Sequence, residues 1–180
     1  MPTRPRPRHR PLAVLAVLAA GGVLAGCADL SEMTEAPPPC PPVELVPDAS
    51  RMTRFADGGR DITDMAWQAE LDGYQGSCKY SDSGVNLQLA VIMSVQRGPA
   101  GGDAAEVPYF VAVPAFYPAY GAKQVFTARV PFTNNAGQAR FRDGEVSIDI
   151  PLDDPADGPN TPVYLGLQLD REQFERLRRK

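Results

Sequence analysis

Three cysteines have the widest chemistry in this chain, because a thiol can be acylated, bind a metal ion or join a second thiol in a disulfide. They are Cys27, Cys40 and Cys78. An odd number leaves one thiol without a partner inside the chain. A metal site needs more ligands than Cys40 and Cys78 supply, and the one histidine, His9, lies close to the N-terminus. The role of Cys27 therefore decides what the other two cysteines do.

The residues before Cys27 have the layout of an export signal. Arginines occupy positions 4, 6, 8 and 10, an apolar run extends from Leu12 to Leu24, and Ala25 and Gly26 lead to the cysteine. A basic head, an apolar stretch and small residues are typical of a secretory signal peptide. A retained anchor helix is the alternative, but the run is shorter than the roughly 20 residues that span a membrane.

The stretch Leu24-Ala25-Gly26-Cys27 resembles the lipobox of bacterial lipoproteins, and the chain as a whole resembles small lipoproteins of proteobacteria. The resemblance implies cleavage before Cys27 by the lipoprotein signal peptidase and a covalent lipid on that cysteine. It also implies delivery to the outer membrane, facing the periplasm, because Ala28 and not an aspartate follows the cysteine directly.

Removal of residues 1–26 changes what the composition allows. The full chain has 18 basic and 22 acidic residues, and the loss of four arginines leaves 14 basic residues and a net charge of −8. A chain with this negative charge is poorly suited to binding the phosphates of nucleic acid, so we exclude nucleic acid as a partner. His9 is lost as well, which removes Ser-His-Asp catalysis and histidine-ligated metals. We expect no cofactor other than the lipid.

The mature chain then divides into a tether, 27–42, and one domain, 43–180. The tether ends in prolines, which favour an extended conformation. With Cys27 lipidated, the resemblance leaves Cys40 and Cys78 in an oxidising compartment, where a disulfide between them is expected. Two separate buried thiols are the alternative. A disulfide would join the start of the domain to an internal strand.

Acidic residues gather in two glycine-containing loops, Asp57–Asp64 and Asp153–Gly158. Carboxylates in a bent loop can bind calcium, but neither loop has the EF-hand spacing. Aspartates that bind their own backbone in turns explain both loops equally well. Paired carboxylates can also cleave glycosidic bonds. No spacing selects a pair among the candidates, which are Glu70, Asp72, Asp143 and Glu145.

Aromatic residues are concentrated between positions 109 and 126. Within that range, the proline-bounded segment Pro114–Gly121 contains Phe116, Tyr117 and Tyr120. If these rings are exposed, they form a partner-binding surface, since aromatic side chains supply large and rigid contact areas. If they are buried, they cap one end of the core.

Short segments with alternating polarity predict an all-β domain. One apolar face carries Met65, Trp67, Ala69 and Leu71, and the odd positions from 85 to 95 are all apolar. Residues 107–113 are apolar on both faces, which predicts a central strand, and residues 48–60 are expected to be irregular. A short C-terminal helix should begin near Arg171, with Asp170 and Gln173 forming its cap.

About seven or eight strands without long helices indicate an antiparallel β-sandwich, and an immunoglobulin-like one is the first choice. We expect a lipid-anchored envelope protein whose domain is a binding or structural module that contacts another envelope protein. Two alternatives are a carboxylate-dependent hydrolase of cell-wall polymer and a carrier of an apolar ligand inside a barrel.

Overall fold

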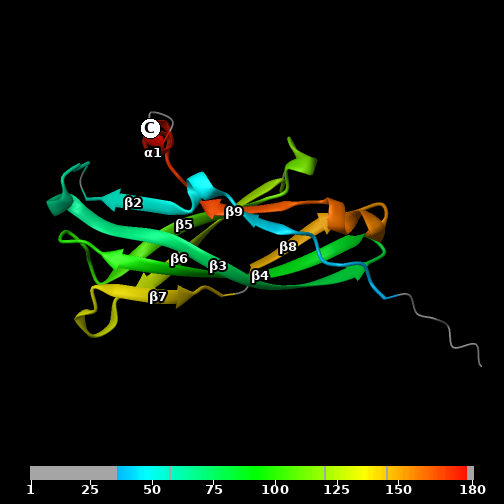
Figure 1. The fold of residues 1–180 in the computed structure, drawn as a ribbon, viewed down its shortest axis with the longest axis horizontal. Helices are drawn as coiled ribbons and strands as arrows, with labels where there is room; N and C mark the ends of the chain where they lie inside the picture. The colour runs from blue at the N-terminus through cyan, green and yellow to red at the C-terminus, as the bar shows by residue number, and fades with distance from the viewer. Residues whose placement is uncertain (1–35, 57, 120, 145, 178–180) are drawn as a thin grey trace, which may run out of the picture. The chain divides into compact units, whose positions relative to one another are not determined.

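The computed structural model describes residues 36–56, 58–119, 121–144 and 146–177 (Figure 1). The strands in these ranges are β1 (Val43–Leu45), β2 (Arg51–Phe55), β3 (Met65–Ser81), β4 (Gly84–Arg97), β5 (Ala104–Ala112), β6 (Lys123–Pro131), β7 (Gln138–Arg142), β8 (Val146–Pro151) and β9 (Val163–Leu167). The helices are the 3-10 turns η1 (Pro47–Ala49), η2 (Ile62–Asp64), η3 (Pro114–Phe116), η4 (Thr133–Asn135) and η5 (Pro155–Asn160), and the α-helix α1 (Arg171–Leu177).

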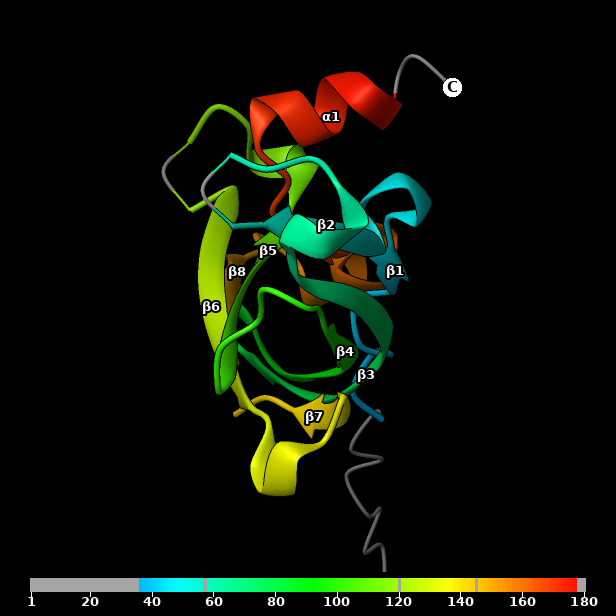
Figure 2. The same ribbon diagram turned by 90° about the vertical axis from the view of Figure 1, so that its left-hand side faces the viewer.

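The strands form two sheets. Sheet A has the order β1-β9-β5-β6, with a parallel pair between β1 and β9 and antiparallel pairs elsewhere. Sheet B has the order β2-β3-β4-β7, and β8 also pairs with β4. Figure 2 shows the two layers from one end. The expected all-β sandwich with a short C-terminal helix is confirmed, with nine strands in the described ranges. The immunoglobulin-like topology stays a prediction.

The long hairpin of β3 and β4 supplies much of the core. Side chains alternate between the faces of a strand, so every second residue points to the space between the sheets. The predicted face of Met65, Trp67, Ala69 and Leu71 is buried, as are all six odd positions from Val85 to Val95. Sheet A opposes them with buried residues of β5 and β9 such as Val107, Tyr109 and Leu165. Strand β5 pairs on both sides, which confirms the predicted central strand.

The outer edge of β4 is covered by two short strands in succession. β8 pairs with its first half and β7 with its second half. Between them the Asp143 N–H donates to the Val91 carbonyl at 2.9 Å, so the chain stays against β4 at the interruption. This interruption places the side chain of Asp143 beside sheet A.

Residues 48–60 are more regular than expected, because β2 lies within them. The sequence did not predict this strand, because Met52 is its single buried residue and the arginines at 51 and 54 interrupt any apolar alternation. α1 adjoins its free edge, where the Gln173 side-chain amide donates to the Thr53 carbonyl at 3.0 Å. The cap of α1 is as predicted, since Asp170 and Gln173 each accept a hydrogen bond from the backbone N–H of the other.

Candidate functional site

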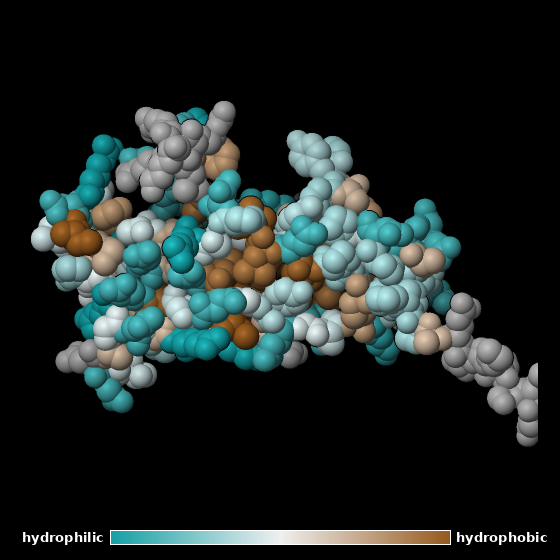
Figure 3. All heavy atoms as spheres, viewed as in Figure 1, coloured by the Kyte–Doolittle hydropathy of each residue, from teal (hydrophilic) through white to brown (hydrophobic). Residues whose placement is uncertain are grey.

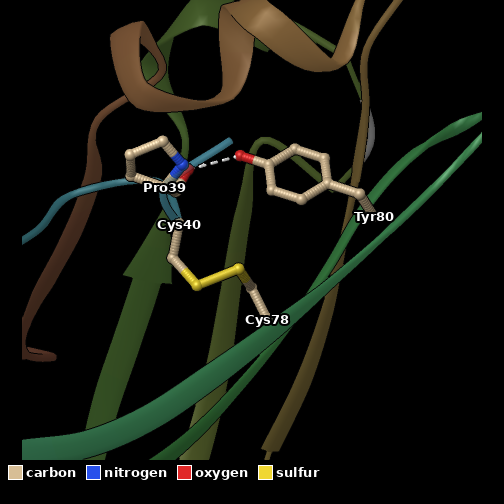
Figure 4. Close-up of a disulfide and its surroundings, with 4 residues drawn as sticks. All are labelled: Pro39, Cys40, Cys78 and Tyr80. Atoms are coloured by element: carbon tan, nitrogen blue, oxygen red, sulfur yellow. Dashed lines mark hydrogen bonds between the residues drawn. A yellow bond between two sulfur atoms is a disulfide. The ribbon is translucent and has the colours of Figure 1, made fainter. Parts of the chain in front are cut away.

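The chain enters the sandwich through residues 39–43, and β3 holds this segment from one face. Tyr74, Cys78 and Tyr80 share that face because they are separated by even numbers of residues. The Tyr80 hydroxyl donates to the Pro39 carbonyl at 2.6 Å (Figure 4), and the Tyr74 hydroxyl donates to the Val43 carbonyl at 3.2 Å. Together with Cys40, these three residues are called the entry clamp below.

The predicted disulfide between Cys40 and Cys78 is confirmed and lies at the centre of the entry clamp (Figure 4). The two Cα atoms are 5.7 Å apart, a usual separation for a bridged pair. The bridge connects the incoming segment to β3 at Cys78, which pairs with Leu87 of β4, whereas β2 pairs with the first part of β3, Met65–Glu70. A force on the preceding residues therefore reaches the long β3–β4 hairpin of sheet B.

Backbone hydrogen bonds hold the segment from the side of sheet A. The Val163 N–H donates to the Pro42 carbonyl, and the Val46 N–H donates to the Leu165 carbonyl, each at 2.9 Å. These bonds extend the three-residue parallel ladder of β1 and β9 at both ends. The incoming segment is therefore attached to both sheets.

The ring of Tyr80 is packed tightly within the entry clamp. Gly158 lies against its hydroxyl so closely that an added Cβ would overlap the phenol. Partial burial raises the pKa of Tyr80 above its ordinary value, which extends to higher pH the range in which the phenol can donate this bond. The sequence pattern placed Tyr80 on the same strand face as Cys78, but no role was predicted for Tyr80 or Tyr74, although both are at even spacing from Cys78.

The aromatic loop after β5 divides its rings between the interior and the surface. Phe116 is partly buried against the core, whereas Tyr117 is 82% exposed. Tyr120 lies outside the described residues. The structure therefore combines the two alternatives, since Phe116 packs on the core beside an exposed Tyr117.

The acidic loops use their carboxylates for local backbone bonds. The Asp64 carboxylate accepts from the N–H groups of Arg60 and Asp61 at 3.2 Å, and Asp154 accepts from Ala156 N–H at 2.9 Å. Asp57 lies outside the described residues. In the described part of the chain, no three metal-ligating side chains of His, Cys, Asp or Glu come together.

The carboxylates considered for hydrolysis have separate partners. Glu70 pairs with Arg51 at 2.7 Å on the outer face of sheet B. Asp72 accepts from Ser94 Oγ at 2.8 Å and lies 3.3 Å from Arg140 Nε. Asp143 accepts from Tyr109, and Glu145 lies outside the described residues. None of the described contacts joins two of these carboxylates.

Tyr109 and Asp143 form a polar pair between a buried phenol and a half-buried carboxylate. The Tyr109 side chain is fully buried and stacks on Phe126 with 5.5 Å between ring centroids. Its hydroxyl donates to Asp143 Oδ2 at 2.7 Å. Burial first, and then the neighbouring carboxylate, raises the pKa of Tyr109, so the phenol stays protonated. Asp143 was predicted as one of the candidate acids. Its hydrogen bond to Tyr109, which comes from the opposite sheet, was not predicted.

No family model, curated protein or solved structure matches this chain. The helices in the described ranges include none that is long and apolar enough to cross a membrane. Cys27, the expected lipidation site, lies outside the described residues.

Proposed function

We propose that this protein is anchored in the cell envelope by a lipid on Cys27 and that its β-sandwich acts as a binding or structural module facing the periplasm from the outer membrane. The entry clamp is the observation that carries the proposal. Disulfides persist in oxidising compartments such as the periplasm, which agrees with export directed by residues 1–26. The basic, apolar and small residues before Cys27 supply the corresponding signal.

The entry clamp suits a domain held by its N-terminal end. Thirteen positions separate Cys27 from Cys40, so the intervening chain can span at most about 45 Å at roughly 3.3–3.6 Å per residue. Any force on this tether would reach the domain at Cys40. The disulfide passes that force to β3, while β1 contributes a ladder of only three residues.

We place the partner-binding surface of this module on the loop that carries Phe116, Tyr117 and Tyr120. Tyr117 exposes most of its ring, and Phe116 packs on the core beside it. A rigid, exposed aromatic side chain is a common anchor of protein interfaces, because it buries a large area with little loss of conformational freedom.

Fractionation tests the anchor. The full chain should sediment with membranes. The Cys27→Ser chain, exported by a signal peptide without a lipobox in place of residues 1–26, should move to the soluble periplasmic fraction with an unchanged melting temperature. If that chain stays in the membrane fraction after its signal is removed, the lipid anchor is contradicted.

Photo-crosslinking in cells tests the partner surface. A benzoylphenylalanine at position 117 should give a discrete protein adduct, whereas the same probe at position 62 should not. Ile62 is the matched control because it is a 68% exposed apolar residue on a different loop. Equal labelling from both positions, or none from position 117, would contradict the assignment of this loop.

A further inference from the structure

An apolar groove of about 530 Å³ lies between α1 and the outer face of sheet A. This volume is within the range of about 300–1,000 Å³ that small-molecule sites occupy. Six apolar residues line the groove: Val46, Ala49, Phe110, Leu167, Leu169 and Phe174. Figure 3 shows hydrophobic side chains reaching the surface among hydrophilic ones on the face below α1. The groove is outside the space between the two sheets, so it differs from a ligand cavity inside a barrel.

A glycine in β9 shapes the floor of this groove. A Cβ on Gly166 would meet the Phe110 ring at 2.8 Å and the Ala49 methyl at 3.0 Å. Because Gly166 has no side chain, the Phe110 ring and the Ala49 methyl pack directly against its backbone, and the space above them stays open. Phe174 of α1 forms the opposite wall and is 53% exposed, so its ring is available to a ligand.

The charged groups of the groove lining are two cations, Lys123 and Arg171, and two carboxylates, Asp48 and Asp170. Lys123 Nζ lies 4.3 Å from the centroid of the Phe110 ring, which holds the ammonium over the apolar floor. Arg171 is the second cation of the lining. Among the described contacts neither is in an ion pair, whereas Asp170 is engaged by Arg54 and by the helix cap. Asp48 is the other acid of the lining, so the lining as a whole is neutral, and the described contacts place Lys123 over the apolar floor without a carboxylate partner.

We propose that this groove binds an amphipathic monoanion with a single alkyl chain, of the fatty-acid class. The alkyl chain lies on Phe110, Leu169 and Phe174, where it removes apolar surface from water. The carboxylate contacts the Lys123 ammonium, which gives a charge-assisted hydrogen bond. This site does not depend on the lipid anchor or on the Tyr117 surface.

Binding is measured on the chain with Cys27→Ser, exported by a cleavable signal peptide without a lipobox in place of residues 1–26, which keeps membrane lipid and detergent out of the preparation. Tetradecanoate is titrated below its critical micelle concentration by calorimetry and by amide NMR, with tetradecan-1-ol as the neutral probe. We expect saturable one-site binding, with amide shifts confined to Leu167, Gln168, Leu169 and their neighbours. We expect the alcohol to bind more weakly than the acid.

Two lysine variants separate charge from packing. Lys123→Gln should weaken tetradecanoate binding about tenfold, because the charge-assisted contact is lost, and should leave the affinity for the alcohol within about twofold. Lys79→Gln is the matched control. It removes the same charge from a lysine of β3 that lies beside the entry clamp and does not line the groove. Phe174→Ala should weaken the binding of both probes.

Three results would overturn the proposal. The first is no saturable binding of tetradecanoate, and the second is an equal loss of affinity in Lys79→Gln and Lys123→Gln. The third is a set of amide shifts away from the groove. A chain that binds tetradecanoate here but does not fractionate with membranes would leave this inference standing and refute the anchor, so the two failures are distinguishable.

Discussion

Removal of the Cys40–Cys78 disulfide should destabilise the domain strongly. The bridge joins residues separated by 38 positions. For a loop of that length, the loss of conformational freedom in the unfolded chain corresponds to about 4 kcal/mol. The variant that removes it is Cys40→Ser with Cys78→Ser, so that neither partner is left as a free thiol. The two tyrosines of the entry clamp should keep the incoming segment in place, because their bonds to Pro39 and Val43 do not pass through sulfur.

Urea unfolding followed by tryptophan fluorescence measures this loss, because Trp67 is buried in the core. For a domain of this size, about 4 kcal/mol corresponds to a fall in melting temperature of roughly 10–20 °C. A reducing agent should lower the stability of the unmodified chain to that of the double variant and leave the variant unchanged. A difference below about 1 kcal/mol between the two proteins would refute the idea that the bridge constrains the domain, since native disulfides in small exported domains typically contribute about 2–5 kcal/mol.

Three further predictions concern the polar contacts and the tight packing. Gly158→Ala should destabilise the fold by about 1–3 kcal/mol in thermal unfolding, because its Cβ overlaps the Tyr80 phenol, while Gly102→Ala, with open space around it, should change little. Tyr109→Phe should cost about 1.5–3 kcal/mol in urea unfolding at pH 7, since the hydroxyl donates to the Asp143 carboxylate; an unchanged midpoint would contradict a role for this bond. The raised pKa of Tyr109 means that the unfolded chain loses the phenolic proton first, so stability should fall above about pH 10, by at most about 1.4 kcal/mol per pH unit for this group. Urea midpoints from pH 8 to 11 should show a smaller fall in Tyr109→Phe.

The alternating segments made most of the fold predictable. A period of two is visible wherever one face of a strand is buried and the other is exposed, as in Met65–Leu71 and Val85–Val95. β2 was not predictable in this way, because only Met52 of its five residues is buried. Its position depends on pairing with the next strand, β3, and on contact with α1, which is distant in sequence.

The contacts of the candidate site were less predictable than its residues. Cys40 and Cys78 were predicted to form a pair because the resemblance assigned Cys27 to the lipid. The hydrogen bonds of Tyr80 to Pro39 and of Tyr109 to Asp143 cross between segments 41 and 34 residues apart. No local pattern encodes such partners, because the register of the strands determines which side chains meet. The groove beneath α1 likewise combines residues from η1, β5, β6, β9 and α1.

Mass spectrometry of the N-terminal peptide, from protein isolated out of its native membranes, tests the proposed anchor most directly. The proposal predicts a mature chain that begins at Cys27, carries acyl groups on that residue and lacks residues 1–26. A mature chain that retains residues of the 1–26 segment, or a Cys27 thiol that reacts freely with an alkylating reagent, would contradict it.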